Sequence, residues 1–285
     1  GDFQRKYTLK KILKKDGTFR EIKPPNIKLR GVQRKILDDY LSVVDLPNCV
    51  YGLSKNRGVK NNASMHQINA KKHILVLDIK DFFPSISYKE INNVFKKIGF
   101  DADCANCLAK LCTISSCLPQ GAPTSPYLSA LVFLKIDGQI QSYASKNNLV
   151  YTRYFDDITL SGDVLTKKMI RHVEKIIEKT GYILNDTKKE VLTPKETKVI
   201  TGVVVGKDCL DVTEEYKDKI KITYDRFLES RNIAGYNSFF GQLGFYLYIN
   251  RVFAVSFFKE ITGIDYDQRI ILFKDLFVDE QKVSM

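Results

Sequence analysis

Residues 151–162, YTRYFDDITLSG, place two adjacent aspartates between two runs that have the aromatic and β-branched pattern of strands. This pattern predicts a β-hairpin whose tight turn holds Phe155, Asp156 and Asp157, so that both carboxylates project from one tip. A solvated turn is the usual setting for an isolated Asp-Asp pair. Left bare, each carboxylate would raise the pKa of the other, and a bound divalent cation would remove that penalty.

A third carboxylate lies upstream of the hairpin. The apolar run HILVLD has the length of a strand and ends at Asp78, ahead of Phe82, Phe83 and a break at Pro84. A sheet that pairs this strand with the hairpin would bring Asp78 to the end that holds the other aspartates. Three carboxylates on neighbouring strands can hold two metal ions about 3.5–4 Å apart, an arrangement used for phosphoryl transfer. The sequence therefore favours a metal site over a solvated turn.

The charge of the chain indicates a polyanionic partner. The chain has 45 Lys and Arg against 33 Asp and Glu, a formal net charge of +12, and nucleic acid is the first candidate. No apolar run approaches the roughly 18–20 residues that span a bilayer. The basic start RKYTLKKILKK also lacks the apolar segment of a signal peptide. We therefore expect a cytoplasmic protein with no membrane partner.

The cysteines raise one further alternative. Cys104 and Cys107 have the C-x-x-C spacing of zinc or redox sites, but no second pair of ligands occurs at a comparable spacing. Together with Cys112 they recur at helical intervals. We therefore expect buried, reduced thiols in this segment.

The remaining patterns mix strands and helices, which predicts an α+β fold. An Asp16-Gly17 turn signal predicts an N-terminal hairpin. An amphipathic helix follows, and its expected inner face consists of Val32, Ile36, Leu37, Tyr40 and Leu41. The other expected elements are a loop over 52–62, helices over 88–99, 102–116 and 166–181, a long helix after the loop at 118–126, short strands near 182–192 and 198–205, and helices from 213 onward with the aromatics of 239–248 in their core.

Three motifs together carry a resemblance to a known family. YFDD resembles the Tyr-x-Asp-Asp signature of reverse transcriptases, and LDIKDFFPSI and LPQGAPTSP are similar to two other core motifs in the usual order and spacing. The segments LPQGAPTSPYLSALV, NNASMH and VITGVVV are most similar to bacterial retron reverse transcriptases. The resemblance implies a right-hand polymerase with fingers at 1–77, a palm at 78–208 whose antiparallel sheet packs on helices, and a helical thumb at 209–285.

The resemblance also implies roles for residues around the aspartates. Two Mg²⁺ ions would be held by Asp78, Asp156 and Asp157, and the Ile79 carbonyl would be a candidate for an extra ligand; whether Mn²⁺ can replace Mg²⁺ stays open. Phe83 matches an aromatic steric gate that selects deoxynucleotides. The site where the template base meets the incoming dNTP would be lined by Gln120 and Gly121.

Basic residues complete the implied nucleotide site. Arg20 is our first choice for binding the triphosphate, together with Lys15, because a guanidinium binds two oxygens at once; the alternative is an ordinary solvated basic hairpin. A lysine that protonates the departing pyrophosphate matches Lys188 and Lys189 equally, and the sequence does not choose between them.

Further residues are implied in RNA binding. The Asn-Ala-x-x-His element of retron enzymes matches Asn62, Ala63 and His66, whereas a second copy at 69–73 looks more like the start of a strand. A helix-capping Asn with an incidental His is the alternative. The Val-Thr-Gly element of the family matches Ile200, Thr201 and Gly202, and the thumb would grip a duplex through Lys217 and Lys221. Phe155 stands where retron enzymes commonly have Ala.

The implied function is RNA-directed DNA synthesis on a cognate structured noncoding RNA, which would give RNA-linked single-stranded DNA. The partners would be this RNA, its DNA product, dNTPs and a separate effector protein of an antiphage system. Intron-type, diversity-generating and abortive-infection reverse transcriptases are alternatives, although they usually differ around QGAPTSP or carry extra domains. A catalytically silent RNA-binding scaffold on the same fold is a further alternative.

Overall fold

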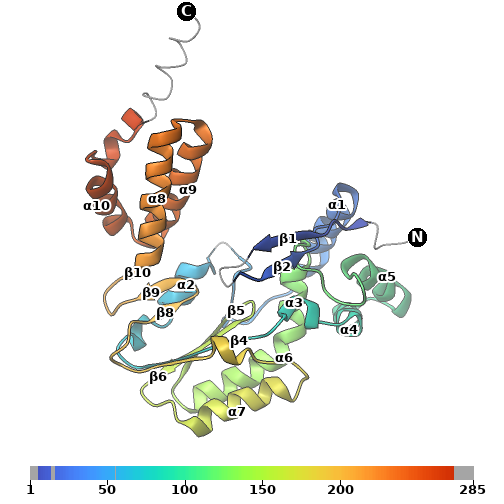
Figure 1. Ribbon diagram of the computed structural model, residues 1–285. Helices are drawn as coiled ribbons and strands as arrows, with labels where there is room; N and C mark the ends of the chain where they lie inside the picture. The colour runs from blue at the N-terminus through green and yellow to red at the C-terminus, as the bar shows by residue number, and fades with distance from the viewer. Residues whose placement is uncertain (1–5, 14–16, 55, 273–285) are drawn as a thin grey trace, which may run out of the picture. The chain divides into compact units, whose positions relative to one another are not determined.

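The computed structural model describes residues 6–13, 17–54 and 56–272, and the chain forms two compact units. The first unit comprises Gly1–Gly58 and Lys72–Thr193, and the second comprises Val59–Lys71 and Pro194–Met285 (Figure 1). Sheets and helices occur in both units, so the predicted α+β class is confirmed. The partition into fingers, palm and thumb divides the chain by role and stays a prediction. No helix in the described part of the chain is long and apolar enough to cross a membrane.

A five-stranded sheet forms the centre of the first unit. Its strand order is β3-β5-β6-β4-β7, and every neighbouring pair is antiparallel except β3 with β5. The central strands β4 and β6 are buried along most of their length. The strands are β3 Val50–Tyr51, β4 His73–Asp78, β5 Val150–Tyr154, β6 Asp157–Gly162 and β7 Glu190–Leu192.

Helices pack against this sheet and share a core with it. The long helix α6 lies along the sheet beside α7, and it buries Phe133, Ile136 and Ile140 in the core (Figure 1). A capping box at Ser87 begins α4, and Gly99 in the left-handed region ends it. The helices are α3 Phe82–Ser85, α4 Tyr88–Ile98, α5 Ala102–Cys112, α6 Ser125–Lys146 and α7 Lys167–Glu178, with a 3₁₀ turn η4 Asp186–Lys188.

The N-terminal hairpin and the helix after it precede the sheet. Strands β1 Lys10–Leu13 and β2 Phe19–Ile22 pair antiparallel, so the predicted hairpin is confirmed; its turn, with Lys15, lies outside the described residues. Helix α1 Ile27–Ile36 continues into a π-helical turn, η2 Leu37–Leu41.

The predicted inner face of α1 is wrong in part, because Val32 and Tyr40 are exposed. Gln33 takes the inner position, where its amide donates to the Leu111 carbonyl at 2.8 Å. The π-helical turn then shifts the phase of the residues that follow.

Four other expectations are corrected. Cys104 and Cys107 are exposed, because α5 buries Ala105, Ala109 and Cys112 instead. Helix α5 ends at Cys112, before a turn in which two serines have positive φ. The loop predicted over 52–62 ends early at helix α2 Val59–Ser64, and the strand predicted over 198–205 is a hairpin of β8 Val199–Ile200 and β9 Val203–Val205.

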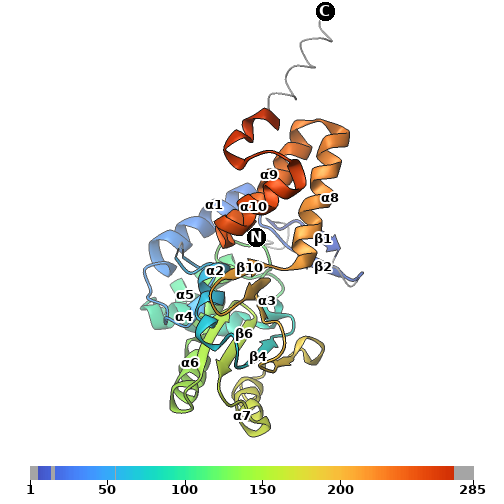
Figure 2. The same ribbon diagram turned by 90° about the vertical axis from the view of Figure 1, so that its left-hand side faces the viewer.

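The second unit combines a small sheet with a helical bundle. Strand β10 Leu210–Val212 adds to β9, giving the order β10-β9-β8. Helices α8 Glu214–Ser230 and α9 Ile233–Ile249 run side by side, and α10 Arg251–Thr262 packs against α9 (Figure 1 and Figure 2). The predicted aromatic core is confirmed for Phe239, which is fully buried, whereas Tyr248 is 44% exposed. Two 3₁₀ turns, η3 Gln67–Asn69 and η5 Tyr266–Gln268, complete this unit.

Candidate active site

Three aspartates meet at one end of the central sheet. Asp78 is the last residue of β4, and it lies directly opposite Asp157, the first residue of β6. The hairpin turn consists of Phe155 and Asp156 alone, because Asp157 pairs with Tyr154; the prediction that Asp157 lies in the turn is therefore corrected. The antiparallel pairing of the two strands thus brings together the carboxylates that the sequence predicted to converge.

The backbone next to Asp78 is held by both neighbouring segments. The Ile79 amide donates to the Asp156 carbonyl at 3.1 Å, and Asn185 donates from its amide to the Asp78 carbonyl at 2.8 Å. The N–H and C=O of one extended residue point to the same side. The Ile79 carbonyl therefore points to the same side as its amide, toward the turn that holds Asp156.

The turn between β5 and β6 has an unusual conformation. Phe155 has a φ of 53°, in the left-handed region that favours glycine. Its ring packs near Phe83, with ring centroids 6.3 Å apart. On another side the ring lies against Gly52, where an added Cβ would come within 2.8 Å of it. Surrounding contacts therefore hold this strained residue in place.

A buried ion pair lies behind the turn. Arg153 binds Asp137 of α6 through two hydrogen bonds, of 2.7 and 2.6 Å, and the Tyr151 hydroxyl donates to the same carboxylate at 2.7 Å. Arg153 is 1% exposed and Asp137 is fully buried. The guanidinium also donates to the Phe155 carbonyl at 3.0 Å. The pair thus connects the core to the turn that carries Asp156.

The electrostatics of the three carboxylates reflect their crowding. Burial, and then the neighbouring Asp156 and Asp78, raise the pKa of Asp157 to about 7. Burial and Asp78 also raise the pKa of Asp156, against the lowering effects of its own backbone amide, Lys188 and Arg20. Three carboxylates at this site are therefore costly to keep charged unless cations come close.

Lys188 forms an ion pair with Asp78. Its Nζ lies 2.8 Å from Asp78 Oδ2, while Asn185 donates from its side-chain amide to Oδ1 at 3.1 Å. Partial burial opposes the charge on Lys188, but the hydrogen bond to Asp78 and the other aspartates outweigh it and raise its pKa. Lys189 instead binds Glu174 of α7 at 2.5 Å. Of the two candidate lysines, the structure places Lys188 at the aspartates.

The carboxylates fit a hard cation by their chemistry. Within residues 6–13, 17–54 and 56–272, no three His, Cys, Asp or Glu side chains are already arranged to hold a metal ion. Asp78 is paired with Lys188 and Asn185 instead. A set of oxygen ligands with several negative charges is what Mg²⁺ prefers. The raised pKa of Asp157 is consistent with a site that needs added positive charge.

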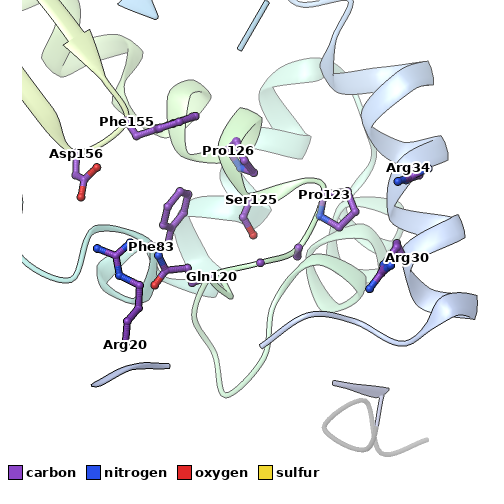
Figure 3. A pocket seen from close by; sticks show the side chains of 12 residues that line it. Arg20, Arg30, Arg34, Phe83, Gln120, Pro123, Ser125, Pro126, Phe155 and Asp156 are labelled. Atoms are coloured by element: carbon purple, nitrogen blue, oxygen red, sulfur yellow. The ribbon is translucent and has the colours of Figure 1, made fainter. Parts of the chain in front are cut away.

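A cavity of about 590 Å³ opens beside the aspartates. Figure 3 shows Arg20 and Asp156 at one end of this cavity and Arg30 and Arg34 at the other. Between them lie the aromatic and loop residues that the resemblance assigned to the nucleotide site. The full lining is Arg20, Arg30, Arg34, Phe83, Gln120, Gly121, Ala122, Pro123, Ser125, Pro126, Phe155 and Asp156.

In the second unit the structure brings together the two elements implied in RNA binding. Asn62 Nδ2 donates to Thr201 Oγ1 at 3.3 Å. Thr201 and Gly202 form the turn between β8 and β9, with φ values of 47° and 80°. A positive φ at a β-branched residue is a genuine outlier, so the contact with Asn62 supports a strained turn.

The side chains of the Asn-Ala-x-x-His element are themselves buried. Asn62, Ala63 and His66 are at most 1% exposed, as is Ile200 beside the turn. Burial lowers the pKa of His66 to about 3, so this ring is neutral near pH 7. In this arrangement such residues can position the turn but cannot reach a ligand directly.

The lysines implied in the thumb line a different cavity. Lys217 and Lys221 lie in a cavity of about 330 Å³ within the second unit. Lys217 is paired with Asp211 at 3.0 Å and with Glu214 at 2.8 Å. Its charge is therefore largely compensated, whereas Lys221 lies 5.6 Å from the centre of the Phe257 ring.

Several residues of the site were not predicted from the sequence. Asn185 could have been noticed, because it ends the run YILN just before the two candidate lysines. Arg30 and Arg34 could also have been noticed, because two arginines four residues apart lie on one face of a helix. The pairing of Arg153 with Asp137 joins a strand to a helix and had no sequence signal.

Comparisons with known proteins identify the family of this chain. A family profile described as reverse transcriptase (RNA-dependent DNA polymerase) matches residues 12–221. The chain therefore belongs to the reverse transcriptase family, and it is an RNA-directed DNA polymerase.

Its similarity to curated proteins defines the type more closely. The chain is 33% identical over 229 residues to the retron Ec86 reverse transcriptase of Escherichia coli, an alignment covering 78% of this chain and 71% of the relative. It is 27% identical over 280 residues to the retron Ec73 enzyme of the same species, covering 89% and 87%. For the retron Se72 enzyme of Salmonella heidelberg (strain 579083-10) the identity is 29% over 211 residues. This alignment covers 71% of the present chain but only 55% of the relative. The chain is a reverse transcriptase of the retron type, as the motifs predicted.

The solved structures support the fold. Telomerase from Candida albicans, in complex with a fragment of telomeric RNA, matches with a TM-score of 0.52 and 13% identity, covering 95% of this chain and 59% of that chain. Apo telomerase from Candida tropicalis matches with a TM-score of 0.50 and 10% identity, covering 73% and 55%. At these identities the likeness concerns the fold alone.

Proposed function

We propose that this protein copies a cognate structured noncoding RNA into single-stranded DNA that stays linked to RNA, using two divalent cations. The observation that carries the proposal is the register of the sheet, which sets Asp78 opposite Asp157 with Asp156 in the adjoining turn. These carboxylates lie beside a cavity of about 590 Å³ that Arg20 and Phe83 also line. That volume is in the range of small-molecule sites and suits a nucleotide.

Each part of the cavity has a role in this proposal. Asp78, Asp156, Asp157 and the Ile79 carbonyl hold Mg²⁺, and Mn²⁺ is a second candidate. When bound, the metals supply Lewis-acid stabilisation of the charge on the attacking and leaving oxygens. Arg20 binds the triphosphate through its planar guanidinium. Gln120 and Gly121, which line the cavity, meet the base pair.

Lys188 donates a proton to the departing pyrophosphate in this proposal. General acid catalysis typically contributes about 10²–10⁴-fold. We expect Lys188→Ala to lower kcat by about 100-fold. The matched variant Lys189→Ala, which loses its contact with Glu174, should keep kcat within about threefold, because Glu174 lies away from the aspartates on α7 and keeps its ion pair with Arg171. Single-nucleotide incorporation under rapid-quench conditions measures both, and equal losses in the two variants would rule out the assignment.

Phe83 selects deoxynucleotides by filling the space that a 2′-hydroxyl needs. We expect Phe83→Val to raise incorporation of ribonucleotides relative to deoxynucleotides by about 10–100-fold, the range that a change of shape in an apolar pocket can give. The ratio of kcat/KM for a matched rNTP and dNTP measures this effect. The dNTP value of the same variant is the internal control, and an unchanged ratio would remove Phe83 from this role.

The retron part of the proposal rests on the second unit. The hydrogen bond between Asn62 and Thr201 supports a turn whose exposed residue, Gly202, lies at its tip. We infer that this turn contacts the cognate RNA, and that the buried Asn-Ala-x-x-His residues keep it in shape. An antiphage role with a separate effector protein belongs to the same proposal.

Sequencing the nucleic acid that copurifies with the protein tests this proposal. The expected result is one predominant RNA joined to DNA complementary to part of it. A spread of unrelated cellular RNAs would support another reverse transcriptase lineage. One predominant RNA that carries no DNA would support an RNA-binding scaffold.

A further inference from the structure

The end of the cavity away from Arg20 and Asp156 is positively charged. The arginines there have no role in the proposed chemistry. Helix α1 contains Lys28, Arg30, Arg34 and Lys35 and no acidic residue. Arg30 and Arg34 are one helical turn apart, and both line the cavity, whereas the two lysines do not. The two arginines therefore form a cationic edge on one face of α1.

These guanidiniums are poorly compensated. Arg30 makes one long hydrogen bond, from Nη2 to the Pro25 carbonyl at 3.4 Å. Neither arginine forms an ion pair with any residue in the described part of the chain. Their side chains lie on an exposed helix face at the cavity edge (Figure 3). Both are thus available to an anion.

Ser125 is a polar residue of the cavity wall whose hydroxyl is already engaged. The Ser125 hydroxyl donates to the Pro119 carbonyl at 2.6 Å and is 1% exposed. Its neighbours along the wall, Pro123 and Pro126, have no amide hydrogen to donate. An anion at this end would therefore be bound mainly by the two arginines.

The geometry of a base pair indicates which anion this is, given the proposed function. The triphosphate of the incoming nucleotide belongs at the end with Arg20 and the aspartates, because the metal ligands lie there. Its base then extends along Gln120 and Gly121 toward the far end. In a base pair the two sugar-phosphate backbones lie at opposite ends of the paired bases. The backbone at the far end is therefore that of the template strand.

We propose that Arg30 and Arg34 form a subsite for the phosphodiester backbone of the template, at the nucleotide being copied and its 5′ neighbour. Contacts to phosphate fix the register of a strand without reading its sequence. Guanidiniums are suited to this task because each can bind two phosphate oxygens. The subsite would hold the unpaired template base in line with the incoming nucleotide.

The test compares two double variants of one helix. Arg30→Gln/Arg34→Gln removes the proposed contacts, and Lys28→Gln/Lys35→Gln removes the same charge from positions outside the cavity. Fluorescence anisotropy measures binding of a DNA primer paired with RNA templates whose 5′ overhang is zero, one, two or five nucleotides. For the wild type, affinity should rise over the first two overhang nucleotides.

The arginine variant should lose about 10-fold in affinity for overhangs of two or more nucleotides and nothing for the blunt duplex. Its salt dependence should flatten by a slope of about 0.7 per lost phosphate contact. The lysine variant should lose less than about threefold, without dependence on the overhang. Equal losses in both variants, or a wild-type response to the overhang in the arginine variant, would overturn the proposal.

Nucleotide use separates this inference from the function on which it rests. The KM for dNTP should stay within about twofold in the arginine variant, because the triphosphate lies at the other end of the cavity. A raised KM with unchanged template binding would assign the arginines to the nucleotide instead. If the wild type makes no DNA, the proposed function fails, while the anisotropy result still decides whether this edge binds template.

Discussion

Asp156→Asn should lower the rate of DNA synthesis by at least about 1000-fold. Asparagine keeps the size of the side chain but removes a negative charge from the proposed metal site, and metal catalysis contributes several kcal/mol to stabilising the transition state. The rate of primer extension on an RNA template with saturating dNTPs and Mg²⁺ measures the effect. Activity above one tenth of the wild-type rate would contradict the assignment of Asp156 as a metal ligand.

Two controls separate this loss from unfolding. The substitution removes one of three carboxylates that repel one another, so the Tm of the variant without metal should not fall. Asp163→Asn makes the same change just beyond the other end of β6, at an exposed residue paired with Lys72. Because surface ion pairs contribute little, Asp163→Asn should keep wild-type activity.

Asp137→Ala should destabilise the protein by about 3–5 kcal/mol, because it leaves the fully buried Arg153 without a counter-ion. The Tyr151 hydroxyl loses its acceptor at the same time. For a chain of this size the loss corresponds to a fall in Tm of roughly 10 °C. Differential scanning calorimetry measures it, and a Tm within about 2 °C of the wild type would show that the pair is not needed for stability.

The double variant Asp137→Leu/Arg153→Met separates stability from catalysis. It replaces both charges with apolar groups, so most of the lost stability should return. It still lacks the donor to the Phe155 carbonyl, which lies next to Asp156. We expect a kcat about 10-fold below that of the wild type, since small displacements of catalytic groups are costly. Full activity in this variant would show that the turn keeps its conformation without Arg153.

The convergence of the three aspartates could be predicted from the sequence, because each lies in or next to a local strand pattern. An apolar run precedes Asp78, and strand patterns lie on both sides of Asp156. When these strands pair in one sheet, as β4 with β6 and β5 with β6, their ends with the aspartates come together. The boundary of the turn was less well predicted. Strand pairing with Tyr154 draws Asp157 into β6, which a propensity argument does not show.

Other features depend on contacts between distant segments. The inner face of α1 was mispredicted because a polar residue, Gln33, is buried by its bond to the Leu111 carbonyl, 78 positions away. Which lysine reaches the aspartates depends on where η4 ends. Lys188 is its last residue and pairs with Asp78, whereas Lys189 follows it and pairs with Glu174. Similarly, Asn62 meets Thr201 across 139 positions. Local sequence patterns do not predict contacts between residues so far apart in the chain.

DNA synthesis by the purified protein on the RNA that copurifies with it tests the central claim most directly. The protein is supplied with Mg²⁺ and all four dNTPs, and the products are sequenced with and without ribonuclease treatment. We predict new DNA that is complementary to one structured RNA, remains joined to a ribonucleotide after digestion, and is absent for Asp156→Asn. No DNA from the wild-type protein, or equal DNA from wild type and Asp156→Asn, would contradict the account.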